Sequence, residues 1–444
     1  RRRFAPSAIA SCAAISRGTP VFPRPFPEHP KMPDTAMIDA DRLNRSLDEL
    51  AAFGRSEGGG VRRLCAGPED GKARDWLRAR LAAEGLAVKV DPVGNMFAVA
   101  ELAGPDAPVV LTGSHLDSQP SGGRYDGAYG VAAGLEAMLA VRKRVKAGGL
   151  AARRNLGLVN WTNEEGARFS PSTLGSAVFA GLVATDFALS REDGDGVTLG
   201  AALAAIGYHG ADRGPAKVAS YVELHIEQGP ELERTGHRIG VVEGNWGTAK
   251  FVADIRGRAA HTGPTPMAER RDALLPAAEL VLFVRALSDA TGGALLSSVG
   301  RLDVIPNSTN VVPAQARLFA EFRAVEPAML AEACAKLVAK AASLSTPGVT
   351  VELVQTLDRP AGTFDPGLRE LIAQTASACG YPPLRVNTVA GHDAIPLKAV
   401  CPSAMIFVPS AGGVSHHESE FTAPEDLAAG AIVLAETLAR LVSA

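Results

Sequence analysis

The sequence contains few cysteines, and no two of them form a CxxC pair. The five cysteines of the 444-residue chain are scattered along it. This pattern argues against a disulfide framework and against a zinc site built from thiolates. It is typical of a reducing compartment, so we predict a cytoplasmic protein. Any metal ion must then be held by histidine and carboxylate side chains.

Long apolar runs and basic stripes are also missing. No uninterrupted run of about 18 apolar residues occurs, which argues against a membrane-spanning helix. The formal net charge is −3 and no basic stripe lies outside the N-terminus, so nucleic acid is not an expected partner. With 46% hydrophobic and 21% charged residues, the composition is that of a globular protein, and its length predicts two domains.

The N-terminal residues differ from the rest of the chain. The first 33 residues are rich in Arg and Pro and contain a single acidic residue, Glu28. This composition is compatible with a transit peptide that directs the chain to an organelle. We favour a disordered leader at residues 1–37, or sequence upstream of a true start at Met32 or Met37.

The longest parts of the chain alternate between helical and strand patterns. Apolar runs predict four buried strands, at 109–115, 156–165, 221–229 and 403–410. Helical spacing begins near residue 38 and recurs at 72–84 and 130–145. The last of these helices carries basic residues in its final turn, as the helix dipole favours. We predict an α/β fold with a mixed, largely parallel sheet flanked by helices.

The pattern changes in the middle of the chain. Between about residues 246 and 357 the predicted elements lie at 248–257, 270–290, 297–305, 310–324, 327–344 and 349–357. Their order is β-α-β-β-α-β, which is that of a ferredoxin-like unit. We predict an α+β domain inserted into the larger one.

Residues of the kind that bind metals lie at or beyond the C-terminal ends of the four strands. They are His115, Asp126, the Glu164–Glu165 pair, His225 and the His416–His417 pair. Taken singly, each has an ordinary explanation: a core histidine, a solvated pair of glutamates, or a helix cap. Open α/β sheets, however, place their sites beyond the carboxyl ends of their strands. We therefore predict that these side chains converge in one crevice.

The residue types indicate the chemistry of that crevice. Imidazole and carboxylate ligands suit Zn²⁺, and also Mn²⁺, Co²⁺ or Ni²⁺. Five ligands exceed the needs of one open catalytic zinc, so we predict two divalent ions that share one carboxylate, with Zn²⁺ favoured. Such ions, about 3.5–4 Å apart, activate water near neutral pH. One residue of the pair Glu164–Glu165 would bind metal and the other would move a proton, and the pattern leaves open which. Asp117 is placed to orient His115.

Six blocks of the sequence resemble the signature blocks of one enzyme family, the amidase/hydantoinase/carbamoylase family. They are GSHLDSQPSGGRYDGAYGVAAGLE, NEEGARF, ELHIEQGP, AAHTGPTPMAERRDA, STNVVP and GGVSHHESE. The family is related to the aminoacylase-type metallopeptidases and includes N-carbamoyl-L-amino acid hydrolases, β-ureidopropionases and allantoate amidohydrolases. The resemblance extends from about residue 40 to the C-terminus. It implies a di-zinc aminopeptidase-like catalytic domain at 38–245 and 358–444, with a lid and dimerisation domain at 246–357.

The resemblance also implies which residues hold the two ions. His115, Asp126 and His225 would bind one ion, and Asp126, Glu165 and His416 the other, with Asp126 between them. Because His417 directly follows His416, it remains a rival ligand.

The other roles follow from the same resemblance. Glu164 would be the general acid and base, and Gln228 would contact the substrate. His261 would polarise the carbamoyl oxygen and reach the site of the partner subunit, so a homodimer is expected. Asn310 and Arg323 would bind the substrate carboxylate. The planar fork of a guanidinium matches a carboxylate, although a salt bridge on a strand face would also explain Arg323.

These expectations combine into a hydrolase that cleaves the carbamoyl group of an N-carbamoyl amino acid to give the amino acid, CO₂ and ammonia. The substrate would be a small ureido carboxylate, either an N-carbamoyl-L-amino acid or N-carbamoyl-β-alanine. Allantoate, in purine and ureide catabolism, is the main alternative. An aminoacylase or dipeptidase on the same scaffold is a further alternative, as is a metal-binding scaffold protein without activity.

Overall fold

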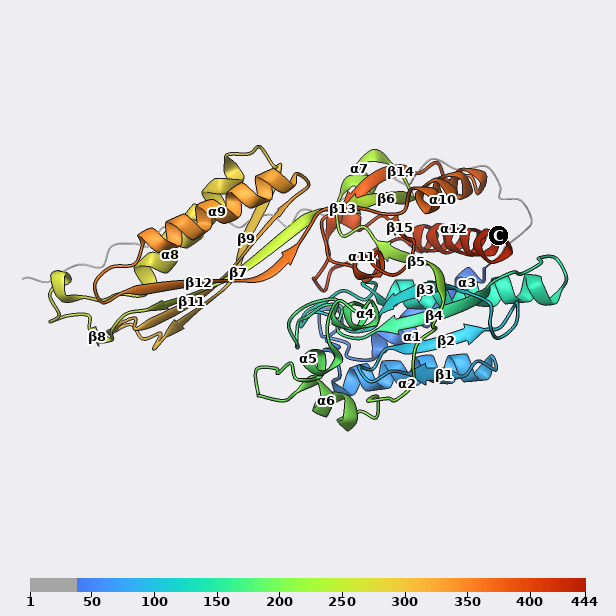
Figure 1. The fold of residues 1–444 in the computed structure, drawn as a ribbon, viewed down its shortest axis with the longest axis horizontal. Helices are drawn as coiled ribbons and strands as arrows, with labels where there is room; N and C mark the ends of the chain where they lie inside the picture. Colours follow the sequence, from blue (N-terminus) through green and yellow to red (C-terminus); the bar gives the residue numbers. More distant parts are fainter. Residues whose placement is uncertain (1–37) are drawn as a thin grey trace, which may run out of the picture. The chain divides into compact units, whose positions relative to one another are not determined.

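The computed structural model describes residues 38–444, and the predicted leader at 1–37 lies outside the described residues. The larger part of the structure, formed by residues 38–245 and 362–444, has a mixed α/β fold. It is built on a nine-stranded sheet in the order β1-β2-β4-β3-β5-β15-β6-β13, with β14 also paired to β6 (Figure 1). Its strands are β1 (Val88–Val90), β2 (Met96–Ala100), β3 (Val109–His115), β4 (Asn155–Trp161), β5 (Val218–Ile226), β6 (Gly240–Asn245), β13 (Gly362–Thr363), β14 (Leu384–Thr388) and β15 (Ser403–Val408).

The centre of this sheet is parallel and its margins are mostly antiparallel. Strand β3 pairs in parallel with β4 and β5, and β5 pairs in parallel with β15. Every residue of β3, β4 and β15 is buried, as expected for parallel strands covered on both faces. The carboxyl ends of these four strands therefore meet at one edge.

Helices pack against the sheet. Successive side chains of a strand point to opposite faces of the sheet and so enter two different hydrophobic cores. The long helices are α1 (Ala40–Ala52), α2 (Pro68–Ala83), α3 (Ala128–Lys146), α10 (Pro366–Ala378) and α12 (Pro424–Ser443). The shorter ones are α4 (Leu174–Phe179), α5 (Thr185–Leu189), α6 (Leu199–Ala205), α7 (Glu231–Thr235), α11 (Ala394–Leu397) and the 3₁₀ turn Ala411–Gly413, whereas the 3₁₀ turn Met267–Glu269 belongs to the part of the chain that forms the second sheet. Val110 of β3 packs in the core that contains α3 and α12, whereas the next residue, Leu111, packs with Trp161 and Leu397 of α11 in the other core.

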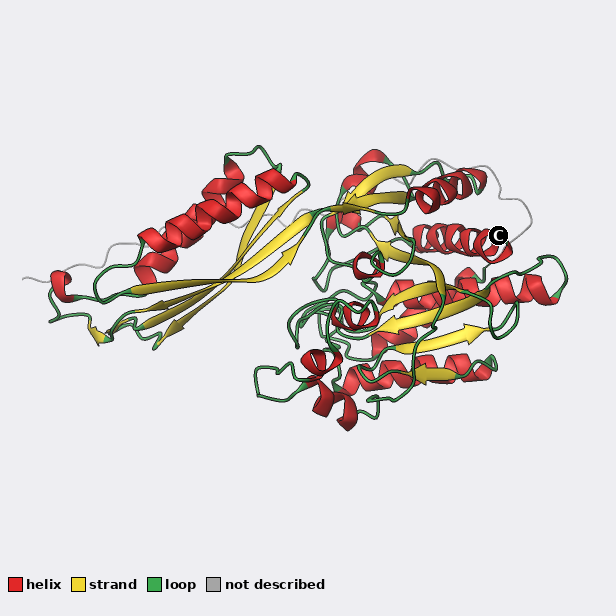
Figure 2. Ribbon diagram, in the orientation of Figure 1, coloured by secondary structure: helices red, strands yellow, loops and turns green. Residues whose placement is uncertain are grey.

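A second sheet with its own core lies between β6 and β13 in the chain. It has four antiparallel strands in the order β12-β7-β11-β9. Figure 2 shows helices lying along one face of this sheet. Its elements follow as β7 (Gly247–Arg256), α8 (Leu274–Asp289), β9 (Leu295–Ile305), β11 (Gln315–Ala324), α9 (Pro327–Ser343) and β12 (Thr350–Arg359). Alternate residues of β7, such as Phe251, pack under α8 and α9, and no helix of residues 38–444 packs on the other face of this sheet. A two-stranded ribbon of β8 (Ala260–His261) and β10 (Val311–Val312) accompanies it.

Four strand predictions were too long, and two of them, at 221–229 and 403–410, only run past the observed ends at Ile226 and Val408. The run predicted at 310–324 forms two strands, β10 and β11. Pro313 interrupts the run because proline has no backbone N–H to donate to a neighbouring strand. The run predicted at 156–165 ends at Trp161, and Asn163 follows with a left-handed φ of 59°. Asn tolerates this conformation, and its side-chain amide donates to the carbonyl of Phe169 at 2.7 Å. The Glu164–Glu165 pair therefore lies in a loop beyond the strand.

None of the helices within residues 38–444 combines the length and the apolar character that crossing a membrane would require.

Candidate metal centre

Five side chains converge at the carboxyl edge of the central strands. The ligand atoms of His115, Asp126 and His225 lie within 4.8 Å of one another, and so do those of Asp126, Glu165 and His416. Asp126 belongs to both sets. Its Oδ1 lies 3.6 Å from Nε2 of His115 and 3.1 Å from Nε2 of His225, whereas its Oδ2 lies 3.3 Å from Nε2 of His416. The two oxygens of one carboxylate therefore face two different sets of ligands.

The loop before α3 places Asp126 in this position. Gly127 follows with a φ of 64°, and a Cβ there would come within 2.4 Å of the His115 ring, so only glycine fits. Burial by itself raises the pKa of Asp126, but hydrogen bonding to the imidazoles of His115, His225 and His416 outweighs it. The pKa of Asp126 consequently lies well below its ordinary value, and the carboxylate stays ionised.

Backbone carbonyls orient two of the imidazoles. Nδ1 of His115 lies 2.9 Å from the carbonyl of Asp117, and Nδ1 of His225 lies 2.8 Å from the carbonyl of Ile226. Each contact leaves Nε2 facing Asp126, which is how outer partners orient metal-binding histidines. The carboxylate of Asp117 is 3.8 Å from His115 and instead accepts hydrogen bonds from the backbone N–H groups of Glu164 and Glu165. Asp117 thus fixes the loop that carries both glutamates.

The two adjacent glutamates have different surroundings. Glu165 lies 3.4 Å from Nε2 of His416 and accepts hydrogen bonds from the backbone and side-chain amides of Gln119. Glu164 lies on the other side, with Oε2 3.6 Å from Nε2 of His115. Burial raises the pKa of Glu164 well above its ordinary value; His115 opposes the shift, and the neighbouring carboxylates add to it. Glu164 is therefore a group that can carry a proton near neutral pH.

Of the two adjacent histidines, only His416 belongs to a candidate metal group among the described residues. It adopts a left-handed φ of 54°, and its side chain is 50% exposed, in contrast to the buried carboxylates it faces. The ring of His417 is held elsewhere, with Nδ1 2.8 Å from the hydroxyl of Ser419. Burial lowers the pKa of His416, but the hydrogen bond to Asp126 and the charge of Glu165 raise it to about 9.

The residues expected to bind substrate fall into two groups. Gln228 lies in the cluster, with Nε2 2.9 Å from Oδ2 of Asp126. Arg323 lies at the end of β11 next to the larger part, where its Nη1 donates to the carbonyl of Val389 at 2.6 Å.

His261 and Asn310 lie together at the other end of the second sheet. The backbone N–H of Thr262 donates to the carbonyl of Asn310 at 3.2 Å, next to the β8–β10 ribbon, and both His261 and Asn310 are exposed. Within residues 38–444, neither side chain has an ion pair or hydrogen bond to the cluster around Asp126.

Sequence reasoning missed four buried residues around the centre. Glu223 and His392 form a third candidate group with His225, and the ring centroids of His392 and His225 are 4.6 Å apart. Asp393 accepts from Ser176 at 2.5 Å. Glu420 accepts from the backbone N–H groups of Tyr125 and Asp126, 3.0 and 3.1 Å away, although nearly 300 residues separate them. The only sequence signal was the position of Glu420 four residues after His416.

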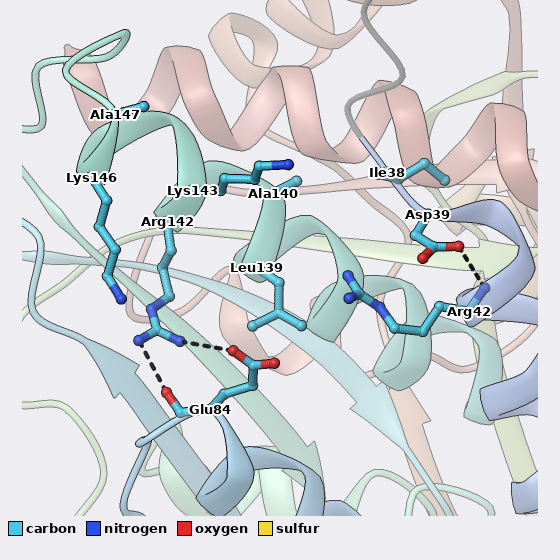
Figure 3. Close-up of a pocket in the computed structure, with 10 residues that line it drawn as sticks. All are labelled: Ile38, Asp39, Arg42, Glu84, Leu139, Ala140, Arg142, Lys143, Lys146 and Ala147. Carbon is cyan, nitrogen blue, oxygen red and sulfur yellow. Dashed lines mark hydrogen bonds and ion pairs between the residues drawn. The ribbon is translucent and has the colours of Figure 1, made fainter.

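A cavity of about 610 Å³ lies between α1 and α3, away from this centre (Figure 3). Its lining includes Arg42, Arg142, Lys143 and Lys146, which are surface residues of two helices. Arg142 donates to the carbonyl of Glu84 at 3.1 Å. Because the candidate metal ligands are all absent from its lining, this cavity is separate from the metal centre.

Comparison with known proteins connects this geometry to a family. Residues 111–440 match the family described as Peptidase family M20/M25/M40. The chain is 38% identical to an N-carbamoyl-L-amino-acid amidohydrolase of Rhizobium meliloti, over 89% of this chain and 95% of that protein. It is 31% identical to an allantoate amidohydrolase of Bacillus subtilis, over 89% and 96%. A crystal structure of an amidase of the hydantoinase/carbamoylase family from Burkholderia vietnamiensis superposes with a TM-score of 0.87, at 39% identity, over 93% of this chain and 99% of that one.

Proposed function

The chain belongs to Peptidase family M20/M25/M40, and from this membership we propose that it hydrolyses the ureido carbon–nitrogen bond of an N-carbamoyl amino acid. The products are the amino acid, CO₂ and ammonia. Relatives named as N-carbamoyl-L-amino-acid amidohydrolases support this reaction, because they cover nearly the whole chain at 33–38% identity. The protein is thus a hydrolase of carbon–nitrogen bonds outside peptides.

The observation that carries the proposal is the placement of Asp126 between two sets of ligands. The family is metal-dependent, and two imidazoles with one carboxylate, or one imidazole with two carboxylates, suit divalent ions such as Zn²⁺ or Mn²⁺. We assign His115 and His225 to one ion and Glu165 and His416 to the other, with Asp126 shared. When bound, two such ions polarise the ureido carbonyl and lower the pKa of water.

The residues of the chain perform the remaining steps. Glu164 takes the proton of the attacking water on its carboxylate and delivers it to the nitrogen that leaves when the carbon–nitrogen bond breaks. Gln228, whose side-chain amide donates to Oδ2 of Asp126, holds the ureido group beside the centre. Arg323 and Asn310 bind the carboxylate of the substrate, and His261 stabilises the negative charge that develops on the carbonyl oxygen.

His261 requires a second copy of the chain. Thr248, which pairs with Arg323, and Arg256 lie near opposite ends of β7. In an extended strand, eight residue steps separate them by about 27 Å. His261 lies beyond that end, whereas Arg323 contacts the larger part at the opposite end. We therefore assign His261, and Asn310 beside it, to the site of a partner subunit, where Asn310 meets the carboxylate held by that subunit's arginine.

Exposed apolar residues of the second sheet suit such a dimer. Leu275 and Leu282 on α8 are 60% and 71% exposed, and β9 is an edge strand with Leu296 and Ile305 exposed. An unpaired edge strand beside an apolar helix face is a surface that a twofold-related copy can cover. We assign this part of residues 246–357 to dimerisation and to closure over the site.

Allantoate is the second candidate substrate. The relative named allantoate amidohydrolase covers as much of this chain as the carbamoyl amino acid relatives do. Allantoate is also a ureido carboxylate, so the same cations and acid–base group would serve it.

An assay of ammonia release tests the proposed function. Purified enzyme, loaded with Zn²⁺ or Mn²⁺, is supplied with N-carbamoyl-L-amino acids, N-carbamoyl-β-alanine, allantoate and, as a control, dipeptides and N-acetyl amino acids. We expect ammonia from at least one ureido carboxylate and no cleavage of the control compounds. Cleavage of dipeptides alone would contradict the proposal.

Mixed dimers test the role of His261. The H261A and E164Q homodimers are each expected to lack activity, because every site then misses one group. In a mixed population formed by co-expression, each heterodimer regains one complete site, so we expect about a quarter of wild-type activity for a twofold dimer. The measurement is ammonia release from the unseparated mixture, and the heterodimer isolated through two affinity tags should show about half of wild-type activity.

The L282E variant is the control for this experiment. A charge on the exposed face of α8 should block dimer formation, which size-exclusion chromatography detects, and should also prevent complementation. A substantially active H261A homodimer, or mixed dimers without activity, would remove His261 from the partner's site.

A further inference from the structure

Arg359 and Arg323 lie on the same face of the second sheet. Thr248 of β7 pairs with Arg323 of β11 on one side and with Arg359 of β12 on the other. Residues directly opposite one another across a sheet project from the same face, and strands two apart are separated by about 10 Å. This face is the one that α8 and α9 leave uncovered, since Ala249, the next residue, packs beneath them. The two guanidinium groups therefore point from adjacent positions toward the same side.

The two arginines differ in how fully they are bonded. Arg323 donates from Nε and Nη2 to the carboxylate of Glu321, each at 3.2 Å, and from Nη1 to the carbonyl of Val389. Arg359 has one hydrogen bond, from Nη2 to the hydroxyl of Thr248 at 3.2 Å. Among the residues that the structure describes, its buried Nε has no acceptor and its guanidinium has no carboxylate within 4.0 Å. Arg323 is neutralised by its own strand neighbour, whereas Arg359 is not.

Arg359 also lies beside the proposed acid–base residue. A Cβ built on Gly391 would be 3.1 Å from Nη1 of Arg359 and 3.7 Å from Oε1 of Glu164, so both groups border the same point. Lys398 adds a second positive charge nearby; its Nζ donates to the side-chain carbonyl of Asn245, at 2.5 Å. Burial, followed by the charge of Arg323, lowers the pKa of Arg359 to about 10.

Arg359 is only partly exposed and its Nε is buried, which is costly for a charged group without an anionic partner, and the described part of the chain provides no such partner. Divalent ions at the nearby centre would increase this excess of positive charge. An anion delivered by the substrate satisfies both the unused Nε–H and the charge.

We propose that Arg359 binds the substrate carboxylate beside Arg323, and that it sets the preference of the enzyme for anionic over neutral ureido compounds. This inference rests on the proposed function. Arg323 positions the carboxylate. Arg359 supplies a positive charge that no carboxylate of the described residues neutralises, and this charge attracts a substrate carboxylate but not a neutral amide. The competing explanation is that Arg359 only stabilises the ionised form of Glu164.

A comparison of two substrates in two variants tests this assignment. The substrates are N-carbamoyl-L-alanine and N-carbamoyl-L-alaninamide, in which an uncharged carboxamide of similar shape replaces the carboxylate. For R359M we expect kcat/KM for the acid to fall about 10- to 100-fold, mainly through KM, with less than about a threefold change for the amide. R359K, which keeps the charge but lacks the fork, should recover part of the loss.

The control variant is R317M. Arg317 projects from the same face of the same sheet but is exposed and held by Asp254 at 2.7 Å, so both substrates should be unaffected. If R359M lowers kcat/KM equally for the acid and the amide and shifts the pH profile of kcat, Arg359 acts only by stabilising the ionised form of Glu164. That result would overturn the inference. If R359M does not fold, the acid-to-amide ratio of R359Q, which also removes the charge, decides, and a ratio unchanged from wild type also overturns it. Failure of the proposed function is distinct, since the wild-type enzyme would then release ammonia from neither this acid nor any other ureido carboxylate of the substrate panel.

Discussion

In the E164Q variant, kcat is expected to fall about 1,000-fold while the metal content stays at the wild-type value. Glutamine has nearly the shape of glutamate but cannot accept and return a proton. Glu164 faces His115 from beside the cluster and belongs to neither candidate metal group that contains Asp126. Steady-state ammonia release and metal analysis by plasma mass spectrometry measure the two quantities.

The neighbouring residue provides a matched control. Glu165 lies within the set formed with Asp126 and His416, so E165Q is expected to lose metal as well as activity. The same chemical change at adjacent positions thus separates proton transfer from metal binding. Full metal loss in E164Q, with metal retained in E165Q, would reverse the two assignments.

Replacement of Asp126 is expected to have the largest effect on metal binding. Asn keeps the shape of the side chain but loses the charge and one oxygen, so D126N should bind neither ion well. Because bound metal contributes several kcal/mol of transition-state stabilisation and each 1.4 kcal/mol is a factor of ten, kcat/KM should fall by at least about 1,000-fold. Metal titration followed by calorimetry, together with ammonia release, tests this.

The D254N variant is the control for D126N. Asp254 is the half-buried partner of exposed Arg317 on the second sheet, so the same substitution there should leave metal binding and activity unchanged. A D126N enzyme that binds two ions with wild-type affinity would show that Asp126 does not lie between them.

The positions of the candidate ligands could be predicted because strand ends determine them. His115 is the last residue of β3, and His225 is the last but one of β5, so an α/β sheet with parallel central strands brings both to one edge. The family resemblance selected His416 over His417, and the structure places only His416 near Asp126. The pattern of apolar residues also anticipated the elements of the second sheet, apart from the break at Pro313.

Other features could not be predicted, because they depend on contacts between distant parts of the chain. Glu420 supports the Asp126 loop from a position 294 residues further along the chain, and no periodicity signals that contact. Arg359 ends an ordinary strand, and its lack of a carboxylate partner within residues 38–444 becomes visible only once the sheet register places it beside Thr248. The turn at Asn163 depends on bonds to the carbonyls of Phe169 and Pro171, which a local pattern does not contain.

The most direct test of the account is an anomalous difference map from crystals of the enzyme grown with Zn²⁺ or Mn²⁺. We predict two peaks in each subunit, about 3.5–4 Å apart, with one oxygen of Asp126 directed at each. One peak should lie beside His115 and His225, and the other beside Glu165 and His416. A single peak, or peaks away from Asp126, would contradict the two-ion centre on which the proposed reaction depends.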